Sequence, residues 1–267
     1  MNARAIPPAT DDARRGDALR AAFLKADKTL RQKLVPILPP EEVSFAGVRM
    51  FVDPRDNYTE RRIWLDRQPP EMTSLLALVE RVEGRRALVL DVGANCGAYT
   101  VPLALAVGEG SRVVAFEPNP VMIGRLGHNV ALNGLGDVVR IEGCALGVET
   151  GEATLNFKEG NHGQASLQPI RPRQRAGGTL VPLRCLNEFV GSAADYETTV
   201  LKIDVEGAEE AVLAPVLDAR GWLPDTLLME TRHAADWTTD LVARLRAKGY
   251  RTALEADGNT LFTRDRA

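Results

Sequence analysis

The sequence has few cysteines and lacks a long hydrophobic run. Its three cysteines, Cys96, Cys144 and Cys185, are odd in number and match neither a metal-ligand spacing nor a disulfide framework. We therefore expect reduced, intracellular thiols. The longest apolar stretch, residues 101–107, is too short to cross a bilayer, and the N-terminal residues contain no apolar segment typical of a signal peptide. These absences make the cytoplasm the expected compartment and exclude a membrane as an expected partner.

An excess of positive charge is also lacking. Lys and Arg number 33 against 36 Asp and Glu, which gives a net charge of −3. Apart from a local patch of arginines at 171–175, the chain has no basic field for a phosphate backbone, so nucleic acid is not an expected partner. A hydrophobic content of 45% over 267 residues is typical of a globular protein with one sizeable core and an N-terminal extension.

The chain divides into three segments by composition. Residues 1–17 are polar and contain a Pro-Pro pair, so we predict a disordered tail. Residues 18–84 predict an extension with a helix that ends before Pro36, a hairpin over residues 43–52 and a second helix over residues 72–82. The first helix suits either a lid or a contact in a homodimer. Residues 85–267 form the main domain.

Strands and helices alternate in the main domain. This pattern predicts an α/β fold with a mostly parallel, seven-stranded sheet and helices on both faces. The turn at 257–259 makes the last two strands an antiparallel hairpin, so the last strand is reversed. We predict strands at 87–92, 112–117, 138–142, 198–204, 225–231, 250–255 and 259–264, and helices at 98–108, 119–133, 206–217 and 236–248.

The connection between the third and fourth strands, residues 143–198, is unusually long. It predicts an extra hairpin formed by residues 153–157 and 179–183, which bracket a polar loop at 158–178. A loop of this length in a compact domain is usually functional or disordered. A lid over the acceptor and an ordinary solvated loop are both open interpretations.

The run LVLDVGANCG at 88–97 predicts a strand, a tight turn and a helix that bind a ligand. The next strand ends in Glu117, where an acid can accept hydrogen bonds from both hydroxyls of a ribose. The spacing of Gly93, Asn95 and Gly97 departs from the dinucleotide pattern GxGxxG, and Asp91 would repel a pyrophosphate. A carboxylate there suits the ammonium of S-adenosylmethionine (SAM). The pattern favours SAM over a nicotinamide dinucleotide, with a coincidental glycine turn as a further alternative.

Acidic residues follow the fourth and fifth strands. The run LKIDVEGAE places Asp204, Glu206 and Glu209 after the fourth strand, and the fifth delivers Glu230 and His233. Because ligands bind at the carboxyl ends of such strands, one of these groups could orient or deprotonate an acceptor hydroxyl. The alternative is that the acids only complement a helix dipole. The spacings that fix metal ligands on one face are absent, so no metal site is predicted.

Five motifs together resemble the FkbM-type family of SAM-dependent methyltransferases. They are LDVGANCGAYT, FEPNP, HNVALNG, GNHGQASL and above all LKIDVEGAE, and the resemblance spans residues 50–264. It implies a Rossmann-like class I methyltransferase fold for 85–267, SAM as the cofactor, and O-methylation of a hydroxyl on a natural product or sugar. The partner would be a small-molecule or glycan acceptor. N-methylation of a peptide or small molecule is the alternative, and an NAD-dependent oxidoreductase is a weaker one.

The resemblance also implies roles for single residues. The candidate catalytic residues come from the strand-end positions described above and are Asp204, Glu206, Glu230 and His233. The implied cofactor-binding residues are Asp91, Gly93, Ala94, Asn95, Gly97, Thr100, Glu117, Pro118, Asn119, Glu142, Cys144, Ala145 and Asp204. Two positions depart from the pattern: Cys144 stands where many methyltransferases have an acid for the adenine amino group, and Asn187 stands where Asp is commoner.

Overall fold

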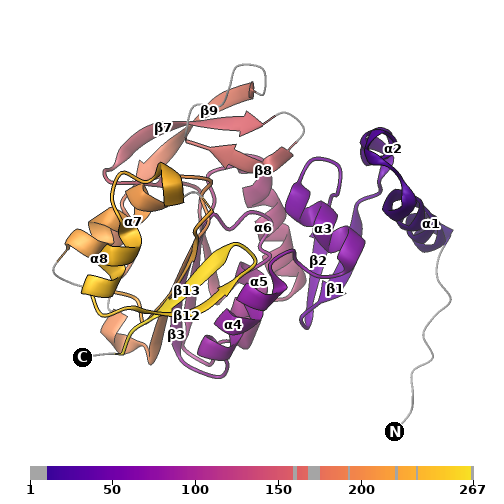
Figure 1. The fold of residues 1–267 in the computed structure, drawn as a ribbon. Coiled ribbons are helices and arrows are strands. Elements are labelled where there is room, and N and C mark those ends of the chain that lie inside the picture. The colour runs from indigo at the N-terminus through magenta and orange to yellow at the C-terminus, as the bar shows by residue number, and fades with distance from the viewer. Residues whose placement is uncertain are drawn as a thin grey trace, which may run out of the picture.

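The computed structural model describes residues 11–158, 161–167, 175–191, 193–219, 222–232 and 234–265. A large mixed sheet with helices on both faces occupies the centre of the molecule (Figure 1). A four-stranded sheet lies across one end of it, at the top of the view. The N-terminal extension packs along one side, to the right.

The central sheet has seven strands in the order β12-β13-β11-β10-β3-β4-β5. All neighbours run parallel except the pairs that β13 makes with β11 and β12, so the predicted reversal of the last strand is confirmed. Asp257 and Gly258 both have positive φ and form the tight turn between β12 and β13. The strands are β3 (Ala87–Val92), β4 (Arg112–Phe116), β5 (Val139–Glu142), β10 (Thr198–Ile203), β11 (Thr226–Glu230), β12 (Arg251–Ala256) and β13 (Asn259–Thr263).

Helices cover both faces of this sheet. The central strands β3 and β10 are therefore buried along their whole length. Alternate side chains point to opposite faces: Val89 packs with α4, α5 and α6, whereas Leu90 packs with α7 and α8. These helices are α4 (Met72–Val82), α5 (Thr100–Ala106), α6 (Pro120–Leu132), α7 (Glu209–Asp218) and α8 (Leu241–Ala247). Each overlaps a helix predicted from the sequence.

The N-terminal extension differs from the prediction in three ways. The first helix begins at Asp11, inside the expected tail. It ends before Asp27, which caps a second helix. A further helix, α3, was not predicted. The elements are α1 (Asp11–Lys25), α2 (Lys28–Leu34), the 3-10 turn η1 (Val35–Ile37), the hairpin β1 (Glu41–Phe45) and β2 (Val48–Val52), and α3 (Tyr58–Asp66).

The extension shares its core with the main domain. Side chains from β1, β2 and α3, including Met50 and Trp64, belong to the same buried cluster as Leu75 and Val89. Burial of this apolar surface fixes the extension against α4, α5 and α6. The wall that it contributes to the site below therefore rests on the core of the protein.

The long crossover forms a second sheet with the order β6-β9-β7-β8. The predicted hairpin is confirmed, with Ala153 opposite Val181 in an antiparallel pair. Much of the polar loop at 158–178 is strand, and residues 159–160 and 168–174 lie outside the described residues, so the lid stays a prediction. The strands are β6 (Ala145–Leu146), β7 (Gly151–Lys158), β8 (Asn161–Ser166) and β9 (Arg175–Arg184).

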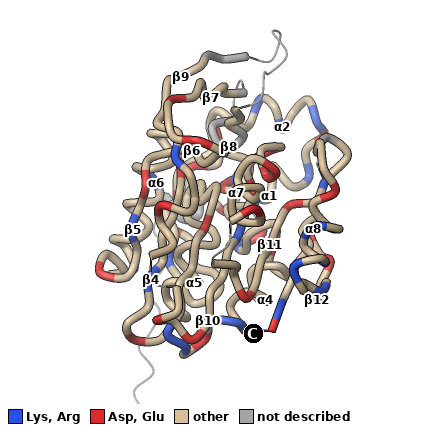
Figure 2. The backbone as a smooth tube through the Cα atoms, turned by 90° about the vertical axis from the view of Figure 1, so that its left-hand side faces the viewer, with Lys and Arg blue, Asp and Glu red and all other residues tan. Residues whose placement is uncertain are grey.

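Charged residues are interspersed over the fold. In the view of Figure 2, blue basic and red acidic positions alternate around the described chain. Within the ranges that the structure describes, none of the helices combines the length and the apolar character that a membrane span needs.

Candidate active site

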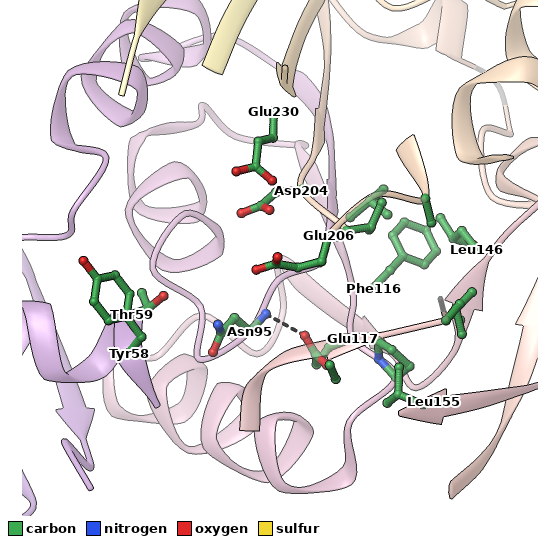
Figure 3. A pocket seen from close by; sticks show the side chains of 18 of the residues that line it. Tyr58, Thr59, Asn95, Phe116, Glu117, Leu146, Leu155, Asp204, Glu206 and Glu230 are labelled. Carbon is green, nitrogen blue, oxygen red and sulfur yellow. Dashed lines mark hydrogen bonds between the residues drawn. The ribbon is translucent and has the colours of Figure 1, made fainter. Parts of the chain in front are cut away.

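A cavity of about 380 Å³ opens at the carboxyl ends of β3, β4, β10 and β11. This is the edge at which open α/β sheets bind ligands. One end of the cavity is apolar and the other carries carboxylates (Figure 3). The N-terminal extension forms one further wall of the cavity. The residues that line it, at the start of α3, are Asn57, Tyr58, Thr59 and Arg62.

The turn after β3 is held tightly against its neighbours. The backbone N–H groups of Gly93 and Ala94 both donate to the carbonyl oxygen of Phe116 at 3.0 Å. Gly93 has φ +80°, and a Cβ there would lie 1.9 Å from the carbonyl oxygen of Asp204. Only glycine fits both the backbone conformation and the space. The turn therefore brings the carboxyl ends of β3 and β10 into direct contact.

Asp91 does not line the cavity, so its predicted place beside a cationic ligand stays a prediction. Its side chain is completely buried, and it accepts a hydrogen bond from Thr100 at 2.6 Å. Lys202, its neighbour on β10, brings its ammonium to 3.3 Å from Asp91 and to 3.8 Å from Asp204. The same ammonium donates to the carbonyl oxygen of Gly93 at 2.9 Å. Asp91 thus holds the lysine under the turn.

Lys202 remains charged although it is buried. Burial alone would lower the pKa of its ammonium, but the Asp91 and Asp204 carboxylates outweigh that effect and raise it. A buried ammonium with two carboxylate partners ties β3 to the end of β10. Lys202 therefore supports both the cofactor turn and the acidic end of the cavity.

Glu117 lies on the cavity wall at the end of β4, as the sequence predicts. Each carboxylate oxygen accepts one backbone N–H at 2.8 Å, from Asn95 and from Asn119. Burial raises the pKa of Glu117 to about 7, although these two N–H donors lower it in part. Asn119 also caps α6 and lies behind the wall. The carboxylate is held in one orientation, with its remaining lone pairs available to a ligand.

The apolar end lies beside Glu117. Phe116, Cys144, Ala145, Leu146 and Leu155 line it, the last from β7 of the small sheet. Cys144 and Ala145 were predicted here. Glu142 was predicted here too, but it pairs with Arg140 and does not line the cavity. An alternating strand sends residues 140 and 142 to the same side, which explains that pair.

Three predicted carboxylates meet at the other end of the cavity. Figure 3 shows Asp204, Glu206 and Glu230 directed into the same space. Glu206 has φ +53°, an unusual conformation for a residue other than glycine. Glu209 holds this turn by accepting from the backbone N–H of Gly207 at 3.0 Å. Glu209 is buried at the start of α7, so it is a structural group rather than a solvated charge.

Glu230 has the most perturbed carboxyl group at this end. Burial raises its pKa to about 8, and the negative charges of Asp204 and Glu206 act in the same direction. Arg232, 3.2 Å away, opposes the shift. At neutral pH the Glu230 carboxyl therefore carries a proton and can donate a hydrogen bond.

Asn95 and Pro118 line the cavity, as predicted. The other predicted residues lie outside the cavity wall or outside the described ranges. Ala94, Gly97, Thr100 and Asn119 support the wall from behind, and His233 lies outside the described residues. Sequence reasoning missed the wall from α3 together with Glu71, Asp257 and Arg232. Among the residues that the structure describes, no three His, Cys, Asp or Glu side chains are grouped to hold a metal ion.

The sheet order, the reversed last strand and the glycine turn beside an acid at the end of the second parallel strand are those of a Rossmann-like class I methyltransferase fold. The family described as Methyltransferase FkbM domain matches residues 91–252. The chain belongs to this family.

Two curated methyltransferases and one solved structure are similar to this chain. Methyltransferase 1 of Beauveria bassiana is 26% identical over 63% of this chain and 74% of its own length. The 31-O-demethyl-FK506 methyltransferase FkbM of Streptomyces tacrolimicus is 29% identical over 64% of this chain and 75% of its own. A crystal structure of methyltransferase FkbM from Methylobacillus flagellatus aligns with a TM-score of 0.43 and 15% identity. That alignment covers 94% of this chain but 60% of the other.

Proposed function

We propose that this protein transfers a methyl group from SAM to a hydroxyl of a small-molecule or glycan acceptor. The observation that supports the proposal is the difference in chemical character between the two ends of one cavity. A fixed carboxylate and an apolar slot lie at one end, and three carboxylates gather at the other. A nucleoside fits the first end, and a group that must lose a proton fits the second.

The residues of the first end suit the nucleoside of SAM. The oriented carboxylate of Glu117 can accept hydrogen bonds from both ribose hydroxyls. The apolar side chains of Phe116, Leu146 and Leu155 can cover the two faces of an adenine ring. When bound, SAM supplies a methyl group on a sulfonium that is already activated for displacement. The protein then has to align the acceptor and receive its proton.

Asp204 is the group that we assign to proton acceptance. It directly follows β10 on the cavity wall, and its carboxylate pairs with the ammonium of Lys202. Glu206, directed into the cavity from the next turn, can orient the acceptor. Glu230 holds a proton at neutral pH, so it serves as a hydrogen-bond donor rather than as the base. These roles need no metal ion.

A hydroxyl acceptor fits this arrangement because a hydroxyl proton needs a carboxylate in place when the bond forms. The relative from Streptomyces tacrolimicus carries O-methylation in its name, which agrees with this choice. A tritiated-methyl assay on a panel of hydroxylated and amine-bearing compounds tests the acceptor class. Incorporation into amines alone would refute hydroxyl transfer.

The cofactor is tested first by calorimetric titration with S-adenosylhomocysteine and with NADH. We expect binding of the former only. Glu117→Ala should weaken that binding about 100-fold, because the two proposed hydrogen bonds from the ribose hydroxyls are lost. Glu142→Gln is the matched control, since Glu142 lies off the cavity, and it should bind as the wild type does. Binding of NADH instead, or equal affinity in both variants, would contradict the proposal.

A further inference from the structure

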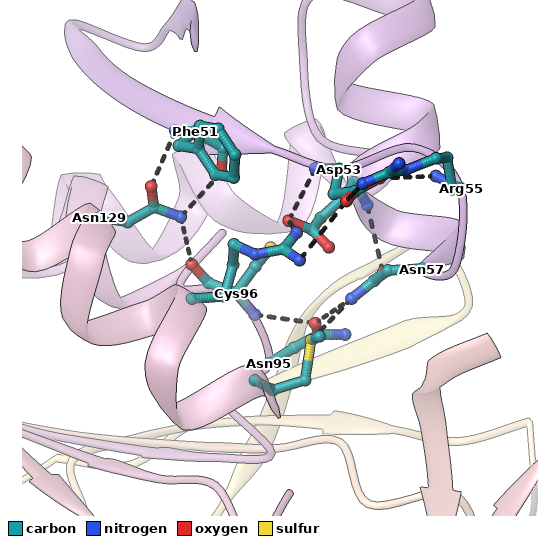
Figure 4. Close-up of polar contacts among 10 residues, drawn as sticks. Phe51, Asp53, Arg55, Asn57, Asn95, Cys96 and Asn129 are labelled. Carbon is teal, nitrogen blue, oxygen red and sulfur yellow. Dashed lines mark hydrogen bonds and ion pairs between the residues drawn. The ribbon is translucent and has the colours of Figure 1, made fainter. Parts of the chain in front are cut away.

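Asn57 links the N-terminal extension to the cofactor turn. It is the residue that caps α3, its side chain is completely buried, and it lies on the cavity wall. Its amide nitrogen donates to the side-chain oxygen of Asn95 at 2.6 Å and lies 3.0 Å from the sulfur of Met122. These contacts cross from the extension to the turn after β3 and to α6 (Figure 4).

The orientation of the Asn57 amide follows from a backbone partner. Its oxygen accepts from the N–H of Glu60 at 3.2 Å, and a backbone N–H can only donate. The nitrogen must therefore face Asn95. The oxygen of Asn95 in turn accepts from the N–H of Cys96 at 2.8 Å, so it too is fixed as an acceptor. The bond between the two asparagines has one possible direction.

Asn95 carries the link on to the cofactor end. Its φ of +52° is rare for a residue with a side chain, and such a conformation persists only when the surroundings hold it. In that conformation its backbone N–H donates to Glu117 at 2.8 Å. A continuous path of hydrogen bonds thus runs from the cap of α3, through Asn57 and Asn95, to the carboxylate assigned to the ribose.

The same helix forms the wall opposite the carboxylates. Tyr58, Thr59 and Arg62 follow Asn57 directly and line the cavity. Glu60, buried in the first turn of α3, pairs with Arg125 of α6. Asn57 therefore stands where the wall from α3 and the cofactor turn meet.

We propose that Asn57 is a positioning residue that couples the docking of α3 to the conformation of the Asn95–Glu117 pair. The N-terminal extension then contributes to cofactor binding. Cofactor binding stabilises the α3 wall, and a docked α3 strengthens cofactor binding by the same factor. The identity of the ligand rests on the proposed function, whereas the coupling between α3 and the turn does not.

Asn57→Asp separates capping from coupling. Aspartate caps helices as well as asparagine does, so α3 keeps its cap. A carboxylate cannot donate to Asn95, and it places two acceptor oxygens face to face. We expect the dissociation constant of S-adenosylhomocysteine to rise about tenfold, which corresponds to about 1.4 kcal/mol. Asn57→Ser, which keeps a capping hydroxyl without the reach to Asn95, gives a second measurement free of the added charge.

Asn133→Asp is the matched control. Asn133 joins α6 to β2 of the extension: its oxygen accepts from the N–H of Arg49 at 3.0 Å, and its nitrogen donates to carbonyl oxygens of the backbone. It does not line the cavity. This variant loses an amide donor between the extension and the main domain but leaves the cofactor turn intact. Its affinity should match that of the wild type.

Hydrogen exchange of the ligand-free protein gives a readout that does not need the cofactor. In Asn57→Ser, exchange should rise together in residues 58–63 of α3 and in residues 94–97 of the turn. Added S-adenosylhomocysteine should protect both segments in the wild type. Faster exchange in α3 alone, or an equal loss of affinity in Asn133→Asp, would overturn the coupling. If the wild type fails to bind S-adenosylhomocysteine, the proposed function fails, and exchange alone decides the coupling.

Discussion

The two ends of the cavity are built in different ways. At the nucleoside end, backbone groups hold the polar side chain: Glu117 accepts from the N–H groups of Asn95 and Asn119. At the acceptor end, three acidic side chains face one another, since Asp204, Glu206 and Glu230 share one space, and their proximity raises the pKa of Glu230. At the first end the backbone fixes the orientation of one acid, whereas at the second end several acids influence one another's protonation.

This difference suits the two tasks of a group-transfer enzyme. A cofactor that is the same in every cycle can be held by rigid backbone turns, which cost nothing to reorganise. An acceptor that must lose a proton needs side chains whose charge can change. Lys202 connects the two ends, because its ammonium lies below the glycine turn and beside Asp204.

The largest effect on activity is expected from Asp204→Asn, which tests the role of the acceptor end. The substitution keeps the shape of the side chain and removes the group assigned to proton acceptance. Turnover should fall about 10²- to 10⁴-fold, as is typical when a general base is lost. Binding of S-adenosylhomocysteine should stay close to that of the wild type, because the nucleoside end is untouched. The measurements are tritiated-methyl transfer to an acceptor found in the panel and calorimetric titration.

Asp218→Asn is the control for this variant. Asp218 ends α7, is 72% exposed and pairs with Arg244, so it shares the chemistry of Asp204 but not the site. Its turnover should be unchanged. Full activity in Asp204→Asn would remove Asp204 from the reaction and leave Glu206 as the base.

Gly93→Ala tests whether the nucleoside end is as rigid as its backbone contacts indicate. A Cβ there would lie 1.9 Å from the carbonyl oxygen of Asp204, and φ is +80°. Strain of the backbone and overpacking together should lower the free energy of unfolding by about 3–5 kcal/mol. Gly249→Ala is the matched control, since φ is +87° and no atom lies within 4 Å. It should cost only about 1–2 kcal/mol in chemical denaturation. Equal losses would show that the turn can relax.

Much of the central sheet could be predicted from the sequence because its signals are local. Buried strands such as β3 are short apolar runs, and the turn at Asp257 and Gly258 fixes the terminal hairpin. The acids at the carboxyl end of the sheet could also be placed, since parallel strands end at the same edge. Asp204, Glu206 and Glu230 were found in this way.

The rest depends on contacts between distant segments. Asp91 faces Lys202 because β3 and β10 are neighbours in the sheet, and no local pattern reports that order. The helix α3 escaped prediction because it is short and buries only three side chains, of which two, Ile63 and Trp64, are apolar. The wall that it forms, and the link through Asn57, could therefore not be derived from sequence periodicity.

The smallest effect expected is on the pH dependence of stability, and it tests the acceptor end. The pKa of Glu230 is raised to about 8 by burial and by Asp204, from an ordinary value of 4.5. Between these values the unfolded chain has released the proton that the folded protein keeps, so stability falls as pH rises from about 5 to 8. Glu60 and Glu117 act in the same direction.

Glu230→Gln should therefore reduce this fall by about 1–3 kcal/mol rather than abolish it. Thermal or urea unfolding at pH 5, 6.5 and 8 gives the measurement, and Glu255→Gln, an exposed acid on β12, should leave the slope unchanged. If Glu230→Gln showed the same dependence of stability on pH as the wild type, the pKa of Glu230 would not be raised in the folded protein. The contrast between the two ends of the cavity would then be lost.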